Sequence, residues 1–187
     1  MIFISISPKL KTKAFLILAF ICLQFIAIAQ HKRGYLVNAG GDTISITGYL
    51  TDNGLIYYKP VGSKKQLYLE AHEVKSVFYD GHLYGFVNNS TRGKGLLIWS
   101  EIIAISHKYI FAISKNYSDI YNIYITDKFT GYLVTDYIIA DSKTKREGAK
   151  QLVLTYFDDC IELKDRIAKN YRFPDGDLLN RGLITCK

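Results

Sequence analysis

Residues 44–59 read ISITGYLTDNGLIYYK, and this stretch decides the fold class of the chain. In residues 44–51, β-branched and apolar residues alternate with polar ones at a period of two, which is typical of a half-buried β-strand. Asn53-Gly54 separates this run from a second one over residues 55–59. Both central residues of a tight hairpin turn need a positive φ, which Asn and Gly adopt at low cost. We therefore predict an antiparallel β-hairpin here.

The same pattern continues on both sides of this hairpin. Asp80-Gly81 is a second tight-turn signal. Ser106-His107-Lys108 is expected to reverse the long apolar stretch of residues 96–113, whose charged residues argue against a membrane span. Further strands are predicted at residues 35–37, 66–70, 74–79, 82–87, 96–105, 109–114, 120–126 and 132–139. Short turns between eight to ten strands predict a curved antiparallel meander or a barrel-like sheet.

The C-terminal segment changes to a helical pattern. Apolar residues fall at i, i+3 and i+4 steps from Ala149 to Tyr171, which predicts one long amphipathic helix of about 25 residues. Thr144 and Glu147 have the spacing of a capping box at its start. Pro174-Asp175-Gly176 is expected to end it.

We therefore predict one α+β domain. Its antiparallel sheet occupies residues 30–140 and its C-terminal helical segment residues 144–187. Within that segment, residues 177–183 are a candidate for a short second helix.

The first residues predict where the protein works. Three lysines precede an uncharged run over residues 14–29, which ends in Ala27-Ile28-Ala29, the small-x-small pattern that signal peptidase cleaves. The run is shorter than the roughly 20 residues that span a bilayer. We expect a cleaved signal peptide over residues 1–29 and an exported mature chain, in the periplasm, the cell envelope or outside the cell. A retained N-terminal anchor is the alternative, and it would be the chain's one contact with a membrane.

Composition argues against a nucleic-acid partner. Residues 30–187 hold 21 Lys and Arg against 17 Asp and Glu, and the basic residues are spread along the chain, whereas nucleic-acid-binding domains cluster them. The chain has 15 Tyr and 10 Phe, residues that favour half-buried sheets and binding surfaces.

Cys160 and Cys186 are the two cysteines that remain after cleavage. Oxidising compartments permit a bridge between them. The chain leaves Cys160 along a helix, turns at Pro174-Asp175-Gly176 and returns over a similar length, so two antiparallel helical legs would bring the thiols together. We expect a structural disulfide. Two buried free thiols are the alternative, and the lack of C-x-x-C spacing disfavours a redox-active pair.

The sequence contains no recognisable catalytic, metal-binding or cofactor-binding motif. The leading hypothesis is a non-enzymatic module that binds or assembles with an envelope protein or another envelope component through its Tyr-rich sheet face or its loops. One alternative is a hydrolase or metal-binding enzyme built from His72, Asp80 and His82, because the two histidines flank the ends of adjacent predicted strands. Another is a small-ligand carrier, if the sheet closes into a hollow barrel.

Two local patterns bracket nearly the whole mature chain. They are Gly34-Tyr35-Leu36-Val37 with Gly41-Asp42-Thr43-Ile44 and Gly48-Tyr49-Leu50, and residues 156–163 (YFDDCIEL) with Ile167 and Cys186. They resemble the opening and the closing segments of exported β-rich proteins of Bacteroides-type bacteria. The chain departs from that pattern in having Ile161 where a Pro is expected and in a shortened tail around Cys186. The resemblance implies export, the β-rich fold and the cysteine pair, and it implies no activity.

Overall fold

A computed structural model describes residues 34–52, 54–89, 96–115, 120–139, 142–170, 173–174 and 182–186. The signal peptide expected over residues 1–29 lies outside the described residues, as does most of the second helix expected at residues 177–183.

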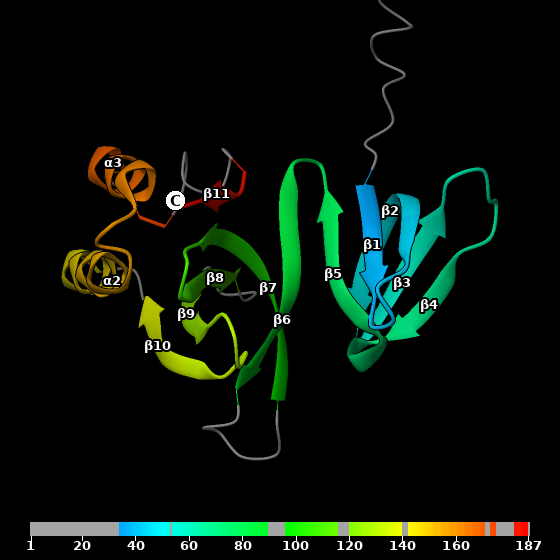
Figure 1. Cartoon of the computed structure of the whole chain (residues 1–187), viewed down its shortest axis with the longest axis horizontal. Coiled ribbons are helices and arrows are strands. Elements are labelled where there is room, and N and C mark those ends of the chain that lie inside the picture. Colours follow the sequence, from blue (N-terminus) through cyan, green and yellow to red (C-terminus); the bar gives the residue numbers. More distant parts are fainter. Residues whose placement is uncertain are drawn as a thin grey trace, which may run out of the picture. The chain divides into compact units, whose positions relative to one another are not determined.

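The described residues form one open sheet of eleven strands (Figure 1). The strands are β1 Gly34–Asn38, β2 Thr43–Asp52, β3 Leu55–Pro60, β4 Leu67–Glu70, β5 Val74–Tyr79, β6 His82–Asn89, β7 Leu96–Ile105, β8 Tyr109–Lys115, β9 Tyr121–Asp127, β10 Leu133–Ile139 and β11 Ile184–Thr185. Their order is β10-β9-β8-β7-β6-β5-β1-β2-β3-β4, with β11 beside β7. The predicted α+β class and antiparallel meander are confirmed. One connection interrupts the meander, because a single 3₁₀ turn at Ala71–Glu73 carries the chain from β4 across to β5, on the far side of β1.

Both predicted tight hairpin turns are present. Asp52 of β2 pairs with Leu55 of β3, and Gly54 between them has a φ of 79°. The second turn joins β5 to β6 and holds a non-glycine residue at positive φ, with Asp80 at 55° and Gly81 at 86°. These values are those that a two-residue hairpin loop requires.

The first half of the sheet, β1 to β5 with β6 and β7, curls toward one face, which we call the front face. Tyr49 of β2 and Trp99 of β7 are four strand positions apart, a distance of about 19 Å in a flat sheet. Their rings nevertheless lie 6.0 Å apart, centre to centre. The curl buries a front-face core of Leu36, Ile46, Ile56, Tyr58, Val74 and Val77.

The second half, β6 to β10, curls toward the opposite or back face. An isolated bridge joins Asn88 of β6 to Tyr132, just before β10, so these two strands approach each other although three strands separate them in the sheet. Side chains fill the inside of this curl: Val87, Ala112 and Tyr124 are buried there, with Ile98, Ile102 and Leu133 packed against them. The hollow barrel on which the carrier alternative depends is therefore not formed by the described strands.

Two helices, α2 Lys143–Tyr156 and α3 Ile161–Lys169, cover the front face of the second half. The single long helix predicted from the sequence is wrong. Helix α2 ends at Tyr156 and is capped by Phe157, whose N–H still bonds to the Val153 carbonyl, and α3 begins after Cys160. Apolar spacing continues through this break. At the break, however, Phe157 is fully buried in the core and Cys160 is bonded to Cys186. Across the described ranges, no helix combines the length and apolar character needed to cross a membrane.

The start of α2 also differs from the prediction. Ser142 is the N-cap, and its side chain accepts a hydrogen bond from the Lys145 N–H at 3.1 Å. Thr144 and Glu147, the predicted capping box, lie inside the helix. A Ser two residues upstream offers the same hydroxyl acceptor, and the chain enters the helix there.

The predicted disulfide between Cys160 and Cys186 is present, with the two Cα atoms 5.1 Å apart. Of the return leg, the structure describes residues 182–186. The leg ends in β11, which runs parallel to β7 beside Ala104 and Ile105. Strand β6 pairs with β7 only as far as Ile102, so β11 takes the place that β6 leaves open.

Candidate functional site

The three residues from which an enzyme site was predicted do not converge. His72 lies in the 3₁₀ turn before β5, whereas Asp80 and His82 follow the other end of that strand. A strand of this length separates its ends by about 17 Å. The exposed His72 ring lies 3.3 Å from the Glu70 carboxylate. In the part of the chain that the structure describes, no group of three or more His, Cys, Asp or Glu residues is placed to hold a metal ion.

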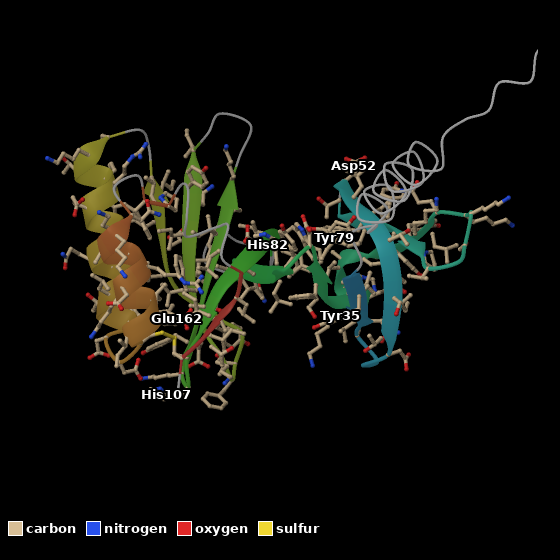
Figure 2. The ribbon with its side chains drawn as sticks, turned by 90° about the horizontal axis from the view of Figure 1, so that it is seen from above. Tyr35, Asp52, Tyr79, His82, His107 and Glu162 are labelled. Carbon is tan, nitrogen blue, oxygen red and sulfur yellow. A yellow bond between two sulfur atoms is a disulfide. The ribbon has the colours of Figure 1, made fainter. Side chains whose placement is uncertain are left out.

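His82 instead pairs with Glu101, a residue that sequence reasoning did not select. His82 is the first residue of β6, next to Tyr79 of β5 (Figure 2), and Glu101 lies on β7. The His82 Nδ1 and the Glu101 Oε1 are 2.6 Å apart, and the two side chains are 22% and 18% exposed. Burial raises the pKa of the Glu101 carboxyl, and the hydrogen bond from His82 opposes that rise.

Aromatic rings surround this pair on the front face. Tyr84 stacks on Trp99 with centroids 6.1 Å apart, and Tyr49 approaches Tyr84 at 5.6 Å. Tyr79 joins them by packing edge-on to Tyr49 at 5.5 Å. Burial, followed by the neighbouring Tyr84, raises the pKa of the Tyr49 hydroxyl well above its ordinary value. Burial raises the pKa of Tyr84 as well.

This arrangement is suited to holding strands together. With the Nδ1 proton donated to Glu101, the His82 ring keeps its Nε2 as a hydrogen-bond acceptor. Ser100, the adjacent hydroxyl on β7, points to the back face and donates to the Ile98 carbonyl at 3.4 Å. The tyrosines have raised pKa values, so they are poor nucleophiles at neutral pH. The hydrogen bond between His82 and Glu101 joins β6 to β7.

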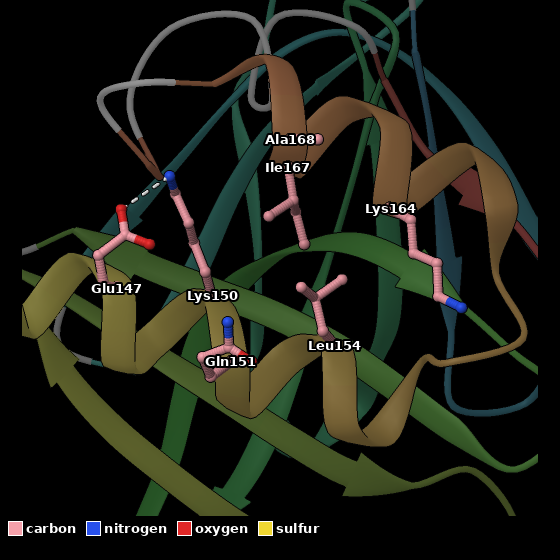
Figure 3. Close-up of a pocket in the computed structure, with 7 residues that line it drawn as sticks. All are labelled: Glu147, Lys150, Gln151, Leu154, Lys164, Ile167 and Ala168. Atoms are coloured by element: carbon pink, nitrogen blue, oxygen red, sulfur yellow. Dashed lines mark hydrogen bonds and ion pairs between the residues drawn. The ribbon is translucent and has the colours of Figure 1, made fainter.

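A groove lies between the two helices (Figure 3). It has a volume of about 400 Å³ and is lined by Glu147, Lys150, Gln151, Leu154, Lys164, Ile167 and Ala168. Leu154 and Ile167 supply its apolar floor. Lys150 is held at the rim by an ion pair with Glu147 at 3.1 Å. The charges at its rim are of both signs, so they do not favour one class of ligand.

The outermost strand on the other side of the sheet, β4, is the most exposed of the described strands. Its sequence is Leu-Tyr-Leu-Glu, and three of its four side chains are exposed. Leu67 is 45% exposed and Tyr68 is 63% exposed. Strand β3 pairs with one edge of β4, and no described strand pairs with the other. An apolar strand with a free edge is a template for another strand.

Hydrogen bonds identify which backbone groups of β4 face its free edge. The Ala71 N–H bonds to the Gly54 carbonyl at 2.8 Å. Residues of an antiparallel strand direct their backbone groups alternately toward and away from the partner. Leu67 and Leu69 therefore bond to β3, whereas Tyr68 and Glu70 direct their N–H and C=O groups outward. The Glu73 carboxylate accepts the outward Glu70 N–H at 2.8 Å, in agreement with this assignment.

Further apolar side chains extend the exposed surface beside β4. On the back face, the Tyr68 ring lies 6.1 Å from the Tyr57 ring of β3, and Leu50 of β2, which pairs with Tyr57, is 61% exposed. We call Leu50, Tyr57, Leu67 and Tyr68 together with the free edge of β4 the β4 surface. A tyrosine-rich sheet face was predicted as a binding surface, but the sequence did not indicate which strand would be outermost.

Comparisons with protein-family models, with curated proteins and with solved structures each find no match. The resemblance to exported proteins of Bacteroides-type bacteria therefore stays a prediction. Any function assigned to the chain must come from its own geometry.

Proposed function

We propose that this protein is an exported, non-enzymatic binding module that receives an extended segment of a protein partner along the free edge of β4. The observation that supports this most directly is the exposure of β4, an apolar strand with outward backbone groups at Tyr68 and exposed side chains at Leu67 and Tyr68. Strand addition uses both features, since backbone hydrogen bonds supply affinity and side chains on alternate positions supply selectivity.

The other outer strand, β10, fits this role less well. Tyr132 ties its start to Asn88 of β6. Helix α2 packs so closely against it that a Cβ on Gly148 would lie 2.5 Å from the Tyr137 hydroxyl. Strand β4 is not held by any comparable described element, and a partner strand can approach its edge directly.

The proposed export of the protein rests on the disulfide and on the signal peptide expected over residues 1–29. Disulfides persist in oxidising, exported compartments, and the bridge between Cys160 and Cys186 ties α3 to the end of β11. The intact mass of the protein recovered from its cells tests this. A mass of residues 30–187 that rises by two hydrogens on reduction is expected. A mass that retains residues 1–29 would instead make the leader a permanent anchor.

Covering of the β4 surface in the cell tests the binding role. In a Tyr68→Cys variant, an impermeant maleimide should label the new thiol slowly in intact cells or their envelopes and several-fold faster in the purified, dilute chain. The matched control is Phe129→Cys, because Phe129 is an aromatic residue of the β9–β10 turn with 80% exposure. Equal labelling of the two variants in cells would show that β4 is uncovered and would contradict the proposal.

A further inference from the structure

We infer that the segment received by β4 is β4 of a second copy of this chain, paired antiparallel about a two-fold axis near Tyr68. This inference rests on the proposed function, since it requires β4 to accept a strand. It adds the identity of the partner and the direction of pairing.

The charges that flank β4 make it complementary to itself in one direction only. Lys64 and Lys65 precede the strand, and Glu70 and Glu73 follow it. A parallel copy would place like charges side by side. An antiparallel copy places the lysines of each chain beside the glutamates of the other, and opposite charges across strands are stabilising whereas like charges are not.

The outward backbone groups give the register. Tyr68 has both its N–H and its C=O on the free edge, so two copies of Tyr68 facing each other exchange two hydrogen bonds across the axis. In this register Leu67 of one copy lies opposite Leu69 of the other. These leucines are on the front face, where Leu67 is exposed and Leu69 packs against the core. Lys64 and Lys65 then lie beside residues 71–72 of the second copy, next to Glu70 and Glu73.

The same geometry limits the length of the new ladder. The Glu73 carboxylate already occupies the outward N–H of Glu70, so pairing is centred on Tyr68 and stops near the ends of a four-residue strand. So small an interface places the dimer among weak, concentration-dependent associations. Symmetry also makes it finite, because a β4–β4 contact uses the same edge on both copies and leaves none free for a third.

Sedimentation velocity of the oxidised mature chain tests the inference. The dimer fraction should rise with protein concentration and fall as salt is added, because the flanking ion pairs are exposed. A Tyr68→Pro variant should be monomeric, since proline removes an outward N–H while leaving the ladder to β3 intact. Near-UV circular dichroism and the unfolding midpoint show whether the variant remains folded.

Charge exchange gives a second test that does not depend on the proline. The Lys64→Glu, Lys65→Glu double variant and the Glu70→Lys variant should each self-associate more weakly than the wild type, and an equimolar mixture of the two should recover dimers. A Lys128→Glu variant, altered at an exposed lysine in the β9–β10 turn, serves as the matched control and should dimerise like the wild type. The inference would be overturned if both charge variants dimerised as strongly as the wild type, or if the mixture of the two formed no more dimer than either variant alone.

The outcomes separate this inference from the proposed function. A chain that is monomeric at every concentration, yet is protected at position 68 in cells, retains the binding role and excludes the second copy as its partner. A monomeric chain that is also labelled freely at position 68 in cells contradicts both.

Discussion

The two halves of the sheet cover the same front face by different means. Over β7 to β10, helices α2 and α3 and the disulfide enclose a core in which Phe111, Phe157 and Phe173 are fully buried. Over β1 to β6, the curl of the sheet closes the core and no described helix covers it. Tyr58 is buried in this core, whereas Tyr49 and Tyr84 remain partly exposed. Strands with similar alternating sequences are thus protected where helices pack on them and partly exposed where the described helices do not.

The pair of His82 and Glu101 lies where these two halves meet. Glu101 pairs with Tyr84 on one side and with Ile113 on the other, so it has the curled aromatic face and the helix-covered core as neighbours. A carboxyl with a raised pKa between two apolar clusters is held by one hydrogen bond to His82. Substitutions in the helix-covered half and at this joint test the difference between the halves.

The largest effect is expected under the helices. Phe157→Ala should lower the free energy of unfolding by about 3–5 kcal/mol, because it leaves a cavity against Phe111 and Tyr109 in a fully enclosed core. The rings of those residues lie 6.2 Å and 6.5 Å from Phe157. The matched control, Phe129→Ala at a site with 80% exposure, should change stability by less than about 0.5 kcal/mol. Urea denaturation compares them, and equal losses would show that the helices do not enclose the core.

The disulfide should come next. Replacing both Cys160 and Cys186 with Ala should cost about 3 kcal/mol, since the bridge closes a loop with a sequence separation of 26 residues. The loss should appear as a lower urea midpoint, and reductant should reproduce it in the wild-type chain and not in the variant. A variant as stable as the wild type would mean that β11 and the helices hold together through packing alone.

A smaller effect distinguishes the observed helix start from the predicted one. Ser142→Ala should cost about 1 kcal/mol, because it removes the acceptor for the Lys145 N–H. Thr144→Ala, at the cap position that the sequence favoured, should cost less than about 0.5 kcal/mol. Thermal unfolding of the two variants ranks them, and the reverse order would move the start of α2 to Thr144.

The smallest effect concerns the joint between the halves. Because burial raises the pKa of Glu101 above its ordinary value of 4.5, the folded chain holds that proton more tightly than the unfolded chain. The stability that this provides is complete below pH 4.5 and is lost as the pH rises through the higher folded pKa. Glu101→Gln has no titrating carboxyl at this position, so it does not lose stability in this way as the pH rises.

The variant should therefore gain stability relative to the wild type between acidic and neutral pH. The gain should be under about 1 kcal/mol, because the site is partly open to water. Urea midpoints measured across this range check the direction. A difference that stays constant with pH would show that Glu101 does not titrate differently on folding.

Much of the fold could be predicted because it depends on residues that are neighbours in the sequence. Asn53-Gly54 and Asp80-Gly81 fix two turns through backbone preference alone, and period-two alternation marks most strands. The helix boundaries could not be predicted in this way. Apolar spacing is equally consistent with one helix or two, and Ser142 competes with Thr144 as a cap on nearly equal terms.

The candidate site was predictable only in its composition. A surplus of tyrosine indicated a binding surface, but Tyr68 is distinguished from other tyrosines by lying on the outermost strand. The pairing of His82 with Glu101 gave no sequence signal beyond a lone acid in an apolar run. The predicted set of His72, Asp80 and His82 does not converge, because β5 separates His72 from the other two residues.

Local sequence was sufficient for the α+β class, the hairpins and the cysteine pair, since each depends on neighbouring residues or on a count of thiols. The order of the strands, the break between α2 and α3 and the exposure of β4 emerged only in the folded chain, because they depend on which distant surfaces pack together. Hydrophobic burial is non-directional and sets no strand order from local pattern alone, so the chain must fold before its free edge exists.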